Sequence, residues 1–216
     1  MQSRGLLVRL EVKPGKEQEV EEFLLSALPL VREEAETTAW FALRFGKSEY
    51  GIFDVFPDDR ALHAHLSGPV GQALAAQHDI LFAHEPEVHS IDVLAEKRPT
   101  GPIHGPDTKG LLLTFNARSG KALEVEDFLR AAEVLVREED ETTAWFALRL
   151  DTGEYGIFDV FRDSGGRFKH LVGLVPRELA KNALSIFGSV PDIDMLDVRA
   201  EKLVAQPAQP ARGVEQ

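Results

Sequence analysis

Five residue types suited to acid–base chemistry or to binding a ring occur as pairs, each pair 105 residues apart. The pairs are Trp40 and Trp145, Arg44 and Arg149, Tyr50 and Tyr155, Asp54 and Asp159, and His65 and His170. An imidazole with a pKa of about 6.5 can accept a proton near neutral pH, and a tyrosine hydroxyl can donate a hydrogen bond to a substrate oxygen. We therefore take the histidines and tyrosines as candidate catalytic residues, and the Trp, Arg and Asp residues as candidate substrate-binding residues.

The pairs arise from an internal duplication. Residues 31–56 and 136–161 differ at only five of 26 positions, and matches continue without a gap from Gly5 and Gly110 to Lys97 and Lys202. Two copies of this length indicate two domains rather than a solenoid, which needs at least three shorter units. We predict a first domain at 1–98 and a second at 109–203. The Pro- and Gly-rich segment 99–108 is predicted to be a linker, and the Pro-, Ala- and Gln-rich tail 204–216 to be disordered.

Each copy predicts the order strand, helix, strand, strand, helix, strand. In the first copy, apolar residues at helical spacing predict a helix over 16–34, interrupted late by Pro29. Two strands around a turn at 46–48 predict a hairpin, and Gly68 followed by Pro69 predicts a break in the second helix. This order is the ferredoxin-like βαββαβ unit of α+β proteins.

The predicted hairpin is apolar on both faces. Alternation places Phe41, Leu43 and Phe53 on one face, which needs a partner to keep it from water. The second copy is the nearest such partner, so we predict an intramolecular pseudo-dimer with the sheets packed together and the helices outside. The candidate residues share the opposite face, which predicts a small-molecule pocket between sheet and helices.

Structural roles compete with the functional ones. A tryptophan in a strand and a histidine on a buried helix stripe are often core residues. Asp54 and Asp159 need partners if they are buried, and Arg44 and Arg149 are the predicted partners across each hairpin. A metal at His63 and His65 is disfavoured because side chains two positions apart diverge on a helix. The acidic runs at 32–36 and 137–141 are expected to be solvated helix ends.

Composition narrows the classes of partner. The formal net charge is −12 and the chain contains no cysteine. An acidic surface disfavours nucleic acid and anionic membranes as partners. The absence of cysteine excludes disulfides, thiolate nucleophiles and thiolate-bound metals. Without a recognisable signal peptide or a long apolar stretch, we expect a cytoplasmic protein.

The stretch "WFALR…YGIFDVFPDDRALHAHLSGPVGQAL", residues 40–74, resembles the antibiotic biosynthesis monooxygenase superfamily of dimeric α/β-barrel proteins. The second copy keeps most of the pattern but has Leu174 where the first has Pro69. The resemblance implies a dimeric α/β barrel within one chain. It also implies oxidation of a phenol or quinol by O2 without metal or flavin, in a pocket with Trp40, Arg44, Tyr50 and His65.

The leading hypothesis is thus a cofactor-independent monooxygenase acting on a small aromatic or quinol-type substrate. The alternatives are a non-catalytic ligand-binding or stress-response module and, third, a haem-binding or haem-degrading protein. No asparagine recurs at equivalent positions, which favours the binding alternative. Because residues 64–71 differ from 169–176, we expect the two pockets to have diverged, with a shifted helix break and a less roomy pocket in the second copy. Further self-association remains open.

Overall fold

The computed structural model describes residues 2–99, 103, 105, 107–173, 177, 181 and 185–204. The first repeat contains β1 (Arg4–Glu11), α1 (Glu17–Glu33), β2 (Ala39–Arg44), β3 (Glu49–Phe56), α2 (Asp59–Ser67), α3 (Pro69–Leu81) and β4 (Glu87–Lys97). The second contains β5 (Lys109–Phe115), α4 (Ala122–Arg137), β6 (Thr142–Leu150), β7 (Tyr155–Phe161), α5 (Ser164–Leu171) and β8 (Asp192–Leu203). The predicted α+β class and ferredoxin-like order are confirmed.

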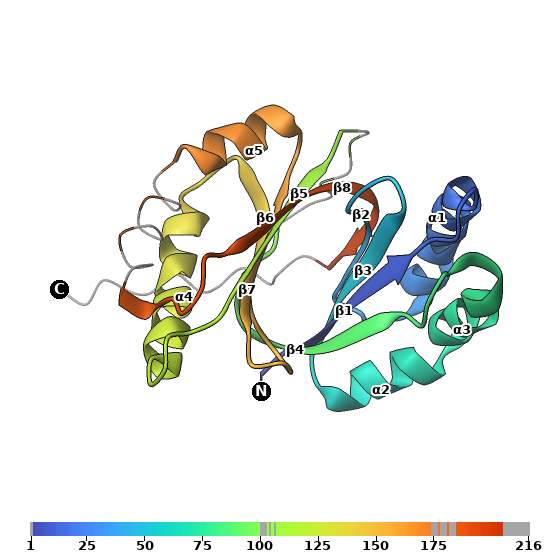
Figure 1. Ribbon diagram of the computed structural model, residues 1–216, viewed down its shortest axis with the longest axis horizontal. Helices are drawn as coiled ribbons and strands as arrows, with labels where there is room; N and C mark the ends of the chain where they lie inside the picture. Colours follow the sequence, from blue (N-terminus) through green and yellow to red (C-terminus); the bar gives the residue numbers. More distant parts are fainter. Residues whose placement is uncertain are drawn as a thin grey trace.

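All eight strands form one closed antiparallel barrel in the order β1-β3-β2-β8-β5-β7-β6-β4. The two repeats join at both seams through their last strands, since β8 pairs with β2 and β4 pairs with β6. The helices lie outside the barrel, with those of the first repeat on one side and those of the second on the other (Figure 1). The predicted pseudo-dimer is thus a barrel whose wall continues from one repeat into the other.

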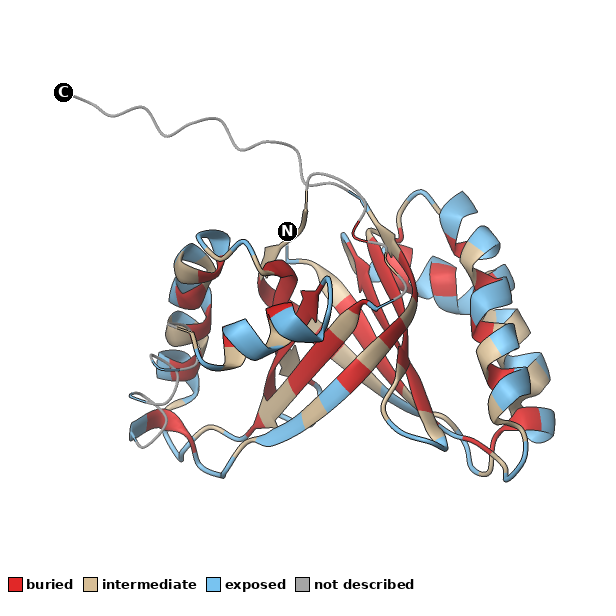
Figure 2. Ribbon diagram, turned by 90° about the horizontal axis from the view of Figure 1, so that it is seen from above, coloured by how far each residue is buried: buried red, intermediate tan, exposed pale blue. Residues whose placement is uncertain are grey.

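The predicted apolar hairpin face fills the barrel. Four phenylalanines, two from each repeat, pack with ring centroids 4.7–6.2 Å apart: Phe41, Phe53, Phe146 and Phe158. Aliphatic residues from both repeats complete this interior cluster. Two further clusters lie between the barrel and its helices, one in each repeat. Buried residues accordingly follow the strands and the inward faces of the helices (Figure 2).

The first helix confirms the predicted stripe but not its interruption. Val20, Leu24, Ala27 and Val31 are buried, yet α1 continues past Pro29 to Glu33. A proline within a helix removes one backbone hydrogen bond. Packing of the buried stripe against the barrel compensates for that loss.

The second helical region is divided where the sequence predicts. Gly68 is extended between α2 and α3, and Pro69 is the first residue of α3. The expected shift of the break in the second repeat is wrong, because α5 ends at Leu171, next to the position equivalent to Ser67. Leu174 and Pro176, on which the expected narrowing of the second pocket partly rested, lie outside the described residues, as do 205–216 of the predicted tail.

Candidate functional site

An aspartate, a histidine and a glutamate form a buried chain between barrel and helices in the first repeat. His65 Nε2 lies 3.5 Å from Asp54 Oδ2, and His65 Nδ1 lies 2.7 Å from Glu34 Oε2. Since a carboxylate only accepts hydrogen bonds, Nδ1 carries the proton shared with Glu34, and Nε2 faces Asp54. We call this set the Asp–His–Glu chain.

The second repeat contains the same chain. His170 Nε2 lies 3.8 Å from Asp159 Oδ1, and His170 Nδ1 lies 2.8 Å from Glu139 Oε2. A threonine hydroxyl supports each glutamate, since Thr37 donates to Glu34 at 2.6 Å and Thr142 donates to Glu139 at 3.0 Å. The Thr142 hydroxyl also lies 3.2 Å from His170 Nδ1.

Local sequence explains how His65 reaches the chain. Asp58 caps α2 by accepting a hydrogen bond from the Ala61 amide at 2.9 Å, which fixes where the helix begins. His65 then lies one turn after Ala61 and Leu62 on the buried stripe, 5.0 Å from the Phe56 ring between centroids. Asp163 caps α5 and places His170 in the same way.

Both aspartates are buried carboxyl groups with strongly raised pKa values. Burial raises the pKa of Asp54 from 3.8 to about 7, opposed by the nearby His65 and supported by Glu34. Asp159 shows the same shift for the same reasons. Burial by itself lowers the pKa of His170, but the hydrogen bond to Glu139 and the charges of Asp159 and Glu139 raise it overall. Each aspartate can therefore exchange a proton near neutral pH.

Each Asp–His–Glu chain lies next to a tryptophan whose indole N–H donates no hydrogen bond. Trp40 opposes Asp54 across β2 and β3, and Trp145 opposes Asp159 across β6 and β7. Among the described residues, the indole Nε1 atoms and the Oδ1 atoms of both aspartates are buried without a hydrogen-bond partner. A buried polar atom without a partner is costly, so each indole N–H and aspartate oxygen is available to an ordered water molecule or to a ligand.

The predicted pairing of Asp54 with Arg44 and of Asp159 with Arg149 is wrong. Arg44 instead opposes Tyr50 and donates to the Gly46 carbonyl oxygen at 3.0 Å. Arg149 pairs with Asp92, and with Glu126 at 2.8 Å. The reason is register, because each arginine lies four residues along its strand from the residue opposite the aspartate, about 13 Å away.

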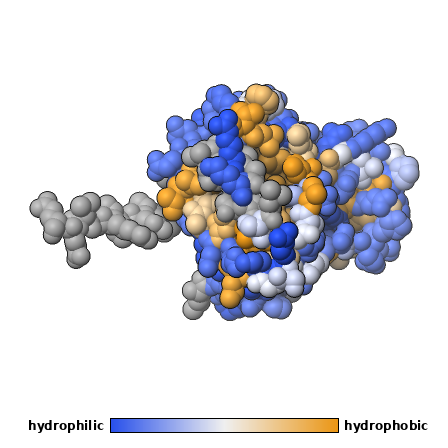
Figure 3. Space-filling model, turned by 60° about the vertical axis from the view of Figure 1, so that its left-hand side comes forward, coloured by the Kyte–Doolittle hydropathy of each residue, from blue (hydrophilic) through white to orange (hydrophobic). Residues whose placement is uncertain are grey.

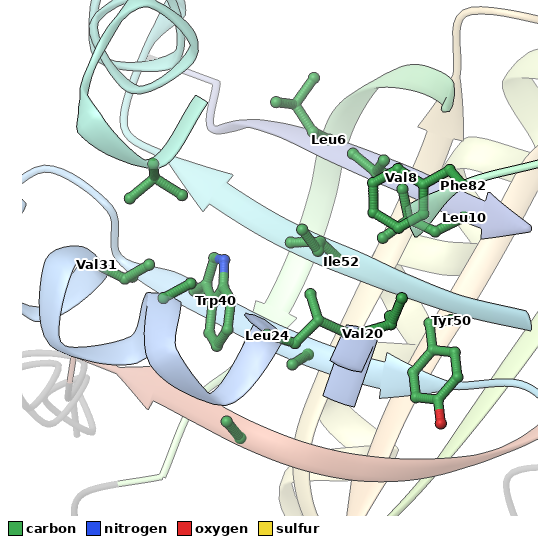
Figure 4. Packing of buried hydrophobic residues seen from close by; sticks show 14 of the residues in the cluster. Leu6, Val8, Leu10, Val20, Leu24, Val31, Trp40, Tyr50, Ile52 and Phe82 are labelled. Carbon is green, nitrogen blue, oxygen red and sulfur yellow. The ribbon is translucent and has the colours of Figure 1, made fainter. Parts of the chain in front are cut away.

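The tyrosines lie with these arginines, away from the Asp–His–Glu chains. Burial raises the pKa of Tyr50, which Arg44 opposes and Glu21 supports. Burial likewise raises the pKa of Tyr155, whose hydroxyl lies 3.5 Å from Glu126 Oε1. Trp40 and Tyr50 lie at opposite ends of the packed layer, with Leu24 and Val20 between them (Figure 4). The structure therefore divides the predicted set, with Trp, Asp and His at one end of each hairpin and Arg and Tyr at the other.

A surface cavity lies at the Tyr50 end of the first repeat rather than at the Asp–His–Glu chain. Its volume is about 560 Å³. It is lined by Arg9, Leu10, Glu11, Ser48, Glu49, His84, Glu85 and Glu87. Leu10 opposes Tyr50, whereas Leu6 opposes Asp54, so the cavity and the chain occupy different ends of β1 and β3.

Glu34 and Glu139 are candidate site residues that the sequence patterns did not single out. They belong to the acidic runs expected to be solvated, yet their side chains are only 19% exposed and contact the histidines. The signal was available, because each glutamate precedes a recurring threonine by three residues. The meaning of this spacing becomes clear only in the fold, where the ends of α1 and α4 lie beside α2 and α5 and the glutamates contact the histidines.

Comparison with known proteins identifies the fold. No family model matches the sequence, and neither does any curated protein. A "putative monooxygenase" from Fusobacterium nucleatum superposes with a TM-score of 0.84 at 14% identity, covering 94% of this chain and 95% of that chain. A protein of the same description from Lactobacillus acidophilus gives 0.82 at 9% identity, covering 96% and 100%. A Listeria monocytogenes ferredoxin-fold protein related to antibiotic biosynthesis monooxygenases gives 0.54 at 8% identity, covering 92% and 95%.

The chain is thus a ferredoxin-like dimeric α/β barrel with both halves on one polypeptide. It has the fold of the proteins related to antibiotic biosynthesis monooxygenases, as its sequence resemblance implied. In the described part of the chain, no helix has the length and apolar character needed to cross a membrane.

Proposed function

We propose that the protein is a cofactor-independent monooxygenase that oxidises a small aromatic or quinol-type substrate at the Asp–His–Glu chain. The observation that carries this proposal is the buried aspartate with a pKa of about 7 beside an unpartnered indole N–H, repeated in both halves. The fold shared with proteins described as monooxygenases is consistent with it.

The geometry suits removal of a proton from a phenolic hydroxyl. The Oδ1 atom of Asp54, which has no hydrogen-bond partner, accepts the proton, and Trp40 Nε1 donates to a substrate oxygen. His65, held by Glu34, lies beside the other carboxylate oxygen of Asp54. A general base is most effective when its pKa lies near the operating pH. The buried site strengthens these interactions by excluding water.

The oxidation balances without a further reductant. A hydroquinone loses two hydrogens and gains one oxygen atom, becoming a hydroxyquinone, while the second atom of O2 leaves as water with those two hydrogens. The substrate supplies all four electrons. The residues of the Asp–His–Glu chain carry out the deprotonation. Loss of the proton makes the ring electron-rich enough to reduce O2.

Substrate entry requires movement. Trp40, Asp54 and His65 are 0%, 1% and 7% exposed. We infer that a ligand reaches them when α2 shifts away from β3. The Gly68 break interrupts the helical region between α2 and α3, which makes this short helix the candidate for the entry movement.

Oxygen uptake tests the proposal. Purified protein is incubated with a panel of hydroquinones and anthrones under O2, and uptake above the protein-free blank is expected for at least one substrate. The rate should rise with pH to a plateau above about 7, because the aspartate must be ionised to act as a base. His65→Ala should abolish most of the uptake that depends on the first site. His63→Ala is the matched control, since this exposed histidine lies on the same helix and points elsewhere.

Uptake no greater than the blank across the panel would contradict the proposal. An aromatic ligand that co-purifies and is held unchanged under O2 would favour the binding-protein alternative. A change in the Soret band on adding haem, followed by its loss with a reductant, would favour haem degradation.

A further inference from the structure

A lysine from the last strand of each repeat reaches the candidate site of the other repeat. Lys202 Nζ, from β8, donates to the Val31 carbonyl oxygen at 2.8 Å and to that of Glu34. Lys97 Nζ, from β4, donates to the Val136 carbonyl oxygen at 2.8 Å and to that of Glu139 at 2.6 Å. In both halves, the lysine therefore binds the backbone of the glutamate that contacts the histidine.

The contact closes the end of a helix. The last carbonyl groups of a helix lack intrahelical donors and carry partial negative charge, so an ammonium group is a favourable partner there. The Glu34 amide donates to Val31 O at 3.1 Å, and the Glu139 amide donates to Val136 O at 3.1 Å. With the lysine on its carbonyl oxygen, each glutamate is held on both sides of its backbone, which restricts where its side chain can point.

Register explains why each lysine arrives in the opposite repeat. Lys202 opposes Trp40 in the β2–β8 pair, and Lys97 opposes Trp145 in the β4–β6 pair. Residues directly opposite each other share one face of the sheet, so each lysine lies on the helix side with the tryptophan. Only closure of the barrel brings these strands together.

We propose that Lys202 and Lys97 are positioning residues supplied across the repeats, and that each candidate site is incomplete without the last strand of the other half. Lys202 orients Glu34, which orients His65 toward Asp54. Lys97 does the same for Glu139, His170 and Asp159. This inference rests on the Asp–His–Glu chain of the proposed function but not on the reaction assigned to it.

The crossed arrangement gives a specific test by NMR of the histidine ring nitrogens. In full-length Lys202→Met, the ring nitrogen signals of His65 should shift toward the averaged tautomer positions of solvent-exposed histidines, while those of His170 stay unchanged. Lys97→Met should shift His170 and leave His65 unchanged. Methionine keeps most of the apolar stem but removes the ammonium group, so the glutamate loses its carbonyl partner.

Lys16→Met is the matched control. Lys16 is a partly exposed lysine next to α1 that pairs with Glu19 at 2.9 Å, so its loss changes the net charge equally without touching the site. Neither histidine should respond. If Lys202→Met fails to fold, Lys202→Arg keeps a donor and should produce a smaller shift confined to His65.

The readout separates this inference from the proposed function, because it needs no turnover. Shifts of both histidines in each variant would indicate general loosening and overturn the inference. So would a shift only of the histidine in the lysine's own repeat, or no shift in any variant. Absence of oxygen uptake with a crossed NMR pattern would reject the monooxygenase and leave the cross-repeat positioning standing.

Discussion

At the scale of single residues, the molecule keeps two carboxyl groups in places where an ionised carboxylate is costly. Asp54 and Asp159 are 1% and 2% exposed and lie in the middle of strands among apolar neighbours. Each faces a histidine, at a separation longer than a strong hydrogen bond. Such groups hold protons at a pH where surface aspartates have lost theirs.

This arrangement predicts a pH-dependent loss of stability. A folded-state pKa of about 7 lies above the unfolded value, so the folded state binds more protons between about pH 4 and 7. The contribution of the two aspartates to the free energy of unfolding is therefore full below about pH 4 and falls as pH rises toward 7, by up to about 4 kcal/mol for each aspartate. The double variant Asp54→Asn, Asp159→Asn should lack this component.

The measurement is urea unfolding of both proteins at several pH values. The stability of the wild-type protein relative to the variant should decline from pH 4 to 7 and then level off. A constant difference over that range would show that the aspartates titrate normally. Using the difference removes the contribution of the acidic groups that do not interact with the two aspartates.

The two histidines are predicted to contribute unequally. His170 has the Thr142 hydroxyl 3.2 Å from Nδ1 and lies 3.8 Å from Asp159, against 3.5 Å between His65 and Asp54. The bulkier residues Lys169 and Val172 are exposed, so they do not narrow the second site as the sequence suggested. We still expect the first site to be the more active one. His65→Ala should reduce oxygen uptake or ligand binding several-fold more than His170→Ala, and equal losses would show two equivalent sites.

At the scale of elements, the same hairpin is packed more tightly in one repeat than in the other. A Cβ added at Gly51 would meet the Val8 carbonyl oxygen at 2.5 Å and the Phe45 ring at 2.7 Å. At the equivalent Gly156, the nearest atom would be the Leu113 carbonyl oxygen at 3.2 Å. The duplicated strands therefore tolerate different side chains despite nearly identical sequences.

This difference predicts unequal effects of one substitution. Gly51→Ala should lower the free energy of unfolding by roughly 1–3 kcal/mol, as expected for overpacking against backbone atoms. Gly156→Ala should cost less, because its neighbour needs to move only slightly. Chemical denaturation of the two variants provides the comparison, and a larger loss for Gly156→Ala would contradict the packing argument.

At the scale of the whole molecule, neither repeat encloses its own core. The interior phenylalanines come from both halves, and β4 and β8 each complete the wall beside the other repeat. Apolar patches also reach the surface on the side that carries α4 and α5 (Figure 3). Exposed large apolar residues of those helices include Leu123, Val134 and Phe168. No described residue covers them, so we expect any further self-association to increase with protein concentration.

Separating the repeats tests the shared interior. The full chain of 23.9 kDa should elute as one barrel on sizing, because both sheet edges are already paired. Residues 1–98 alone should dimerise or aggregate, since the edges of β2 and β4 and the barrel-facing apolar surface would be open. A monomeric fragment with cooperative unfolding would contradict this, whereas a dimeric fragment would re-create the barrel from two identical halves.

The sequence by itself determined the duplication, the βαββαβ order, the apolar face of the hairpin and the five recurring pairs of candidate residues, because these follow from local periodicity and from comparison of the copies. Helix continuation through Pro29 could not be predicted, since tertiary packing outweighs the local penalty. Only the tertiary structure decided that Asp54 meets His65 rather than Arg44, and that Glu34 joins them. It also decided that Lys97 and Lys202 cross between repeats. Those contacts depend on strand register and on barrel closure. Local sequence encodes neither register nor closure, because both arise when segments distant in the chain bury their apolar faces together.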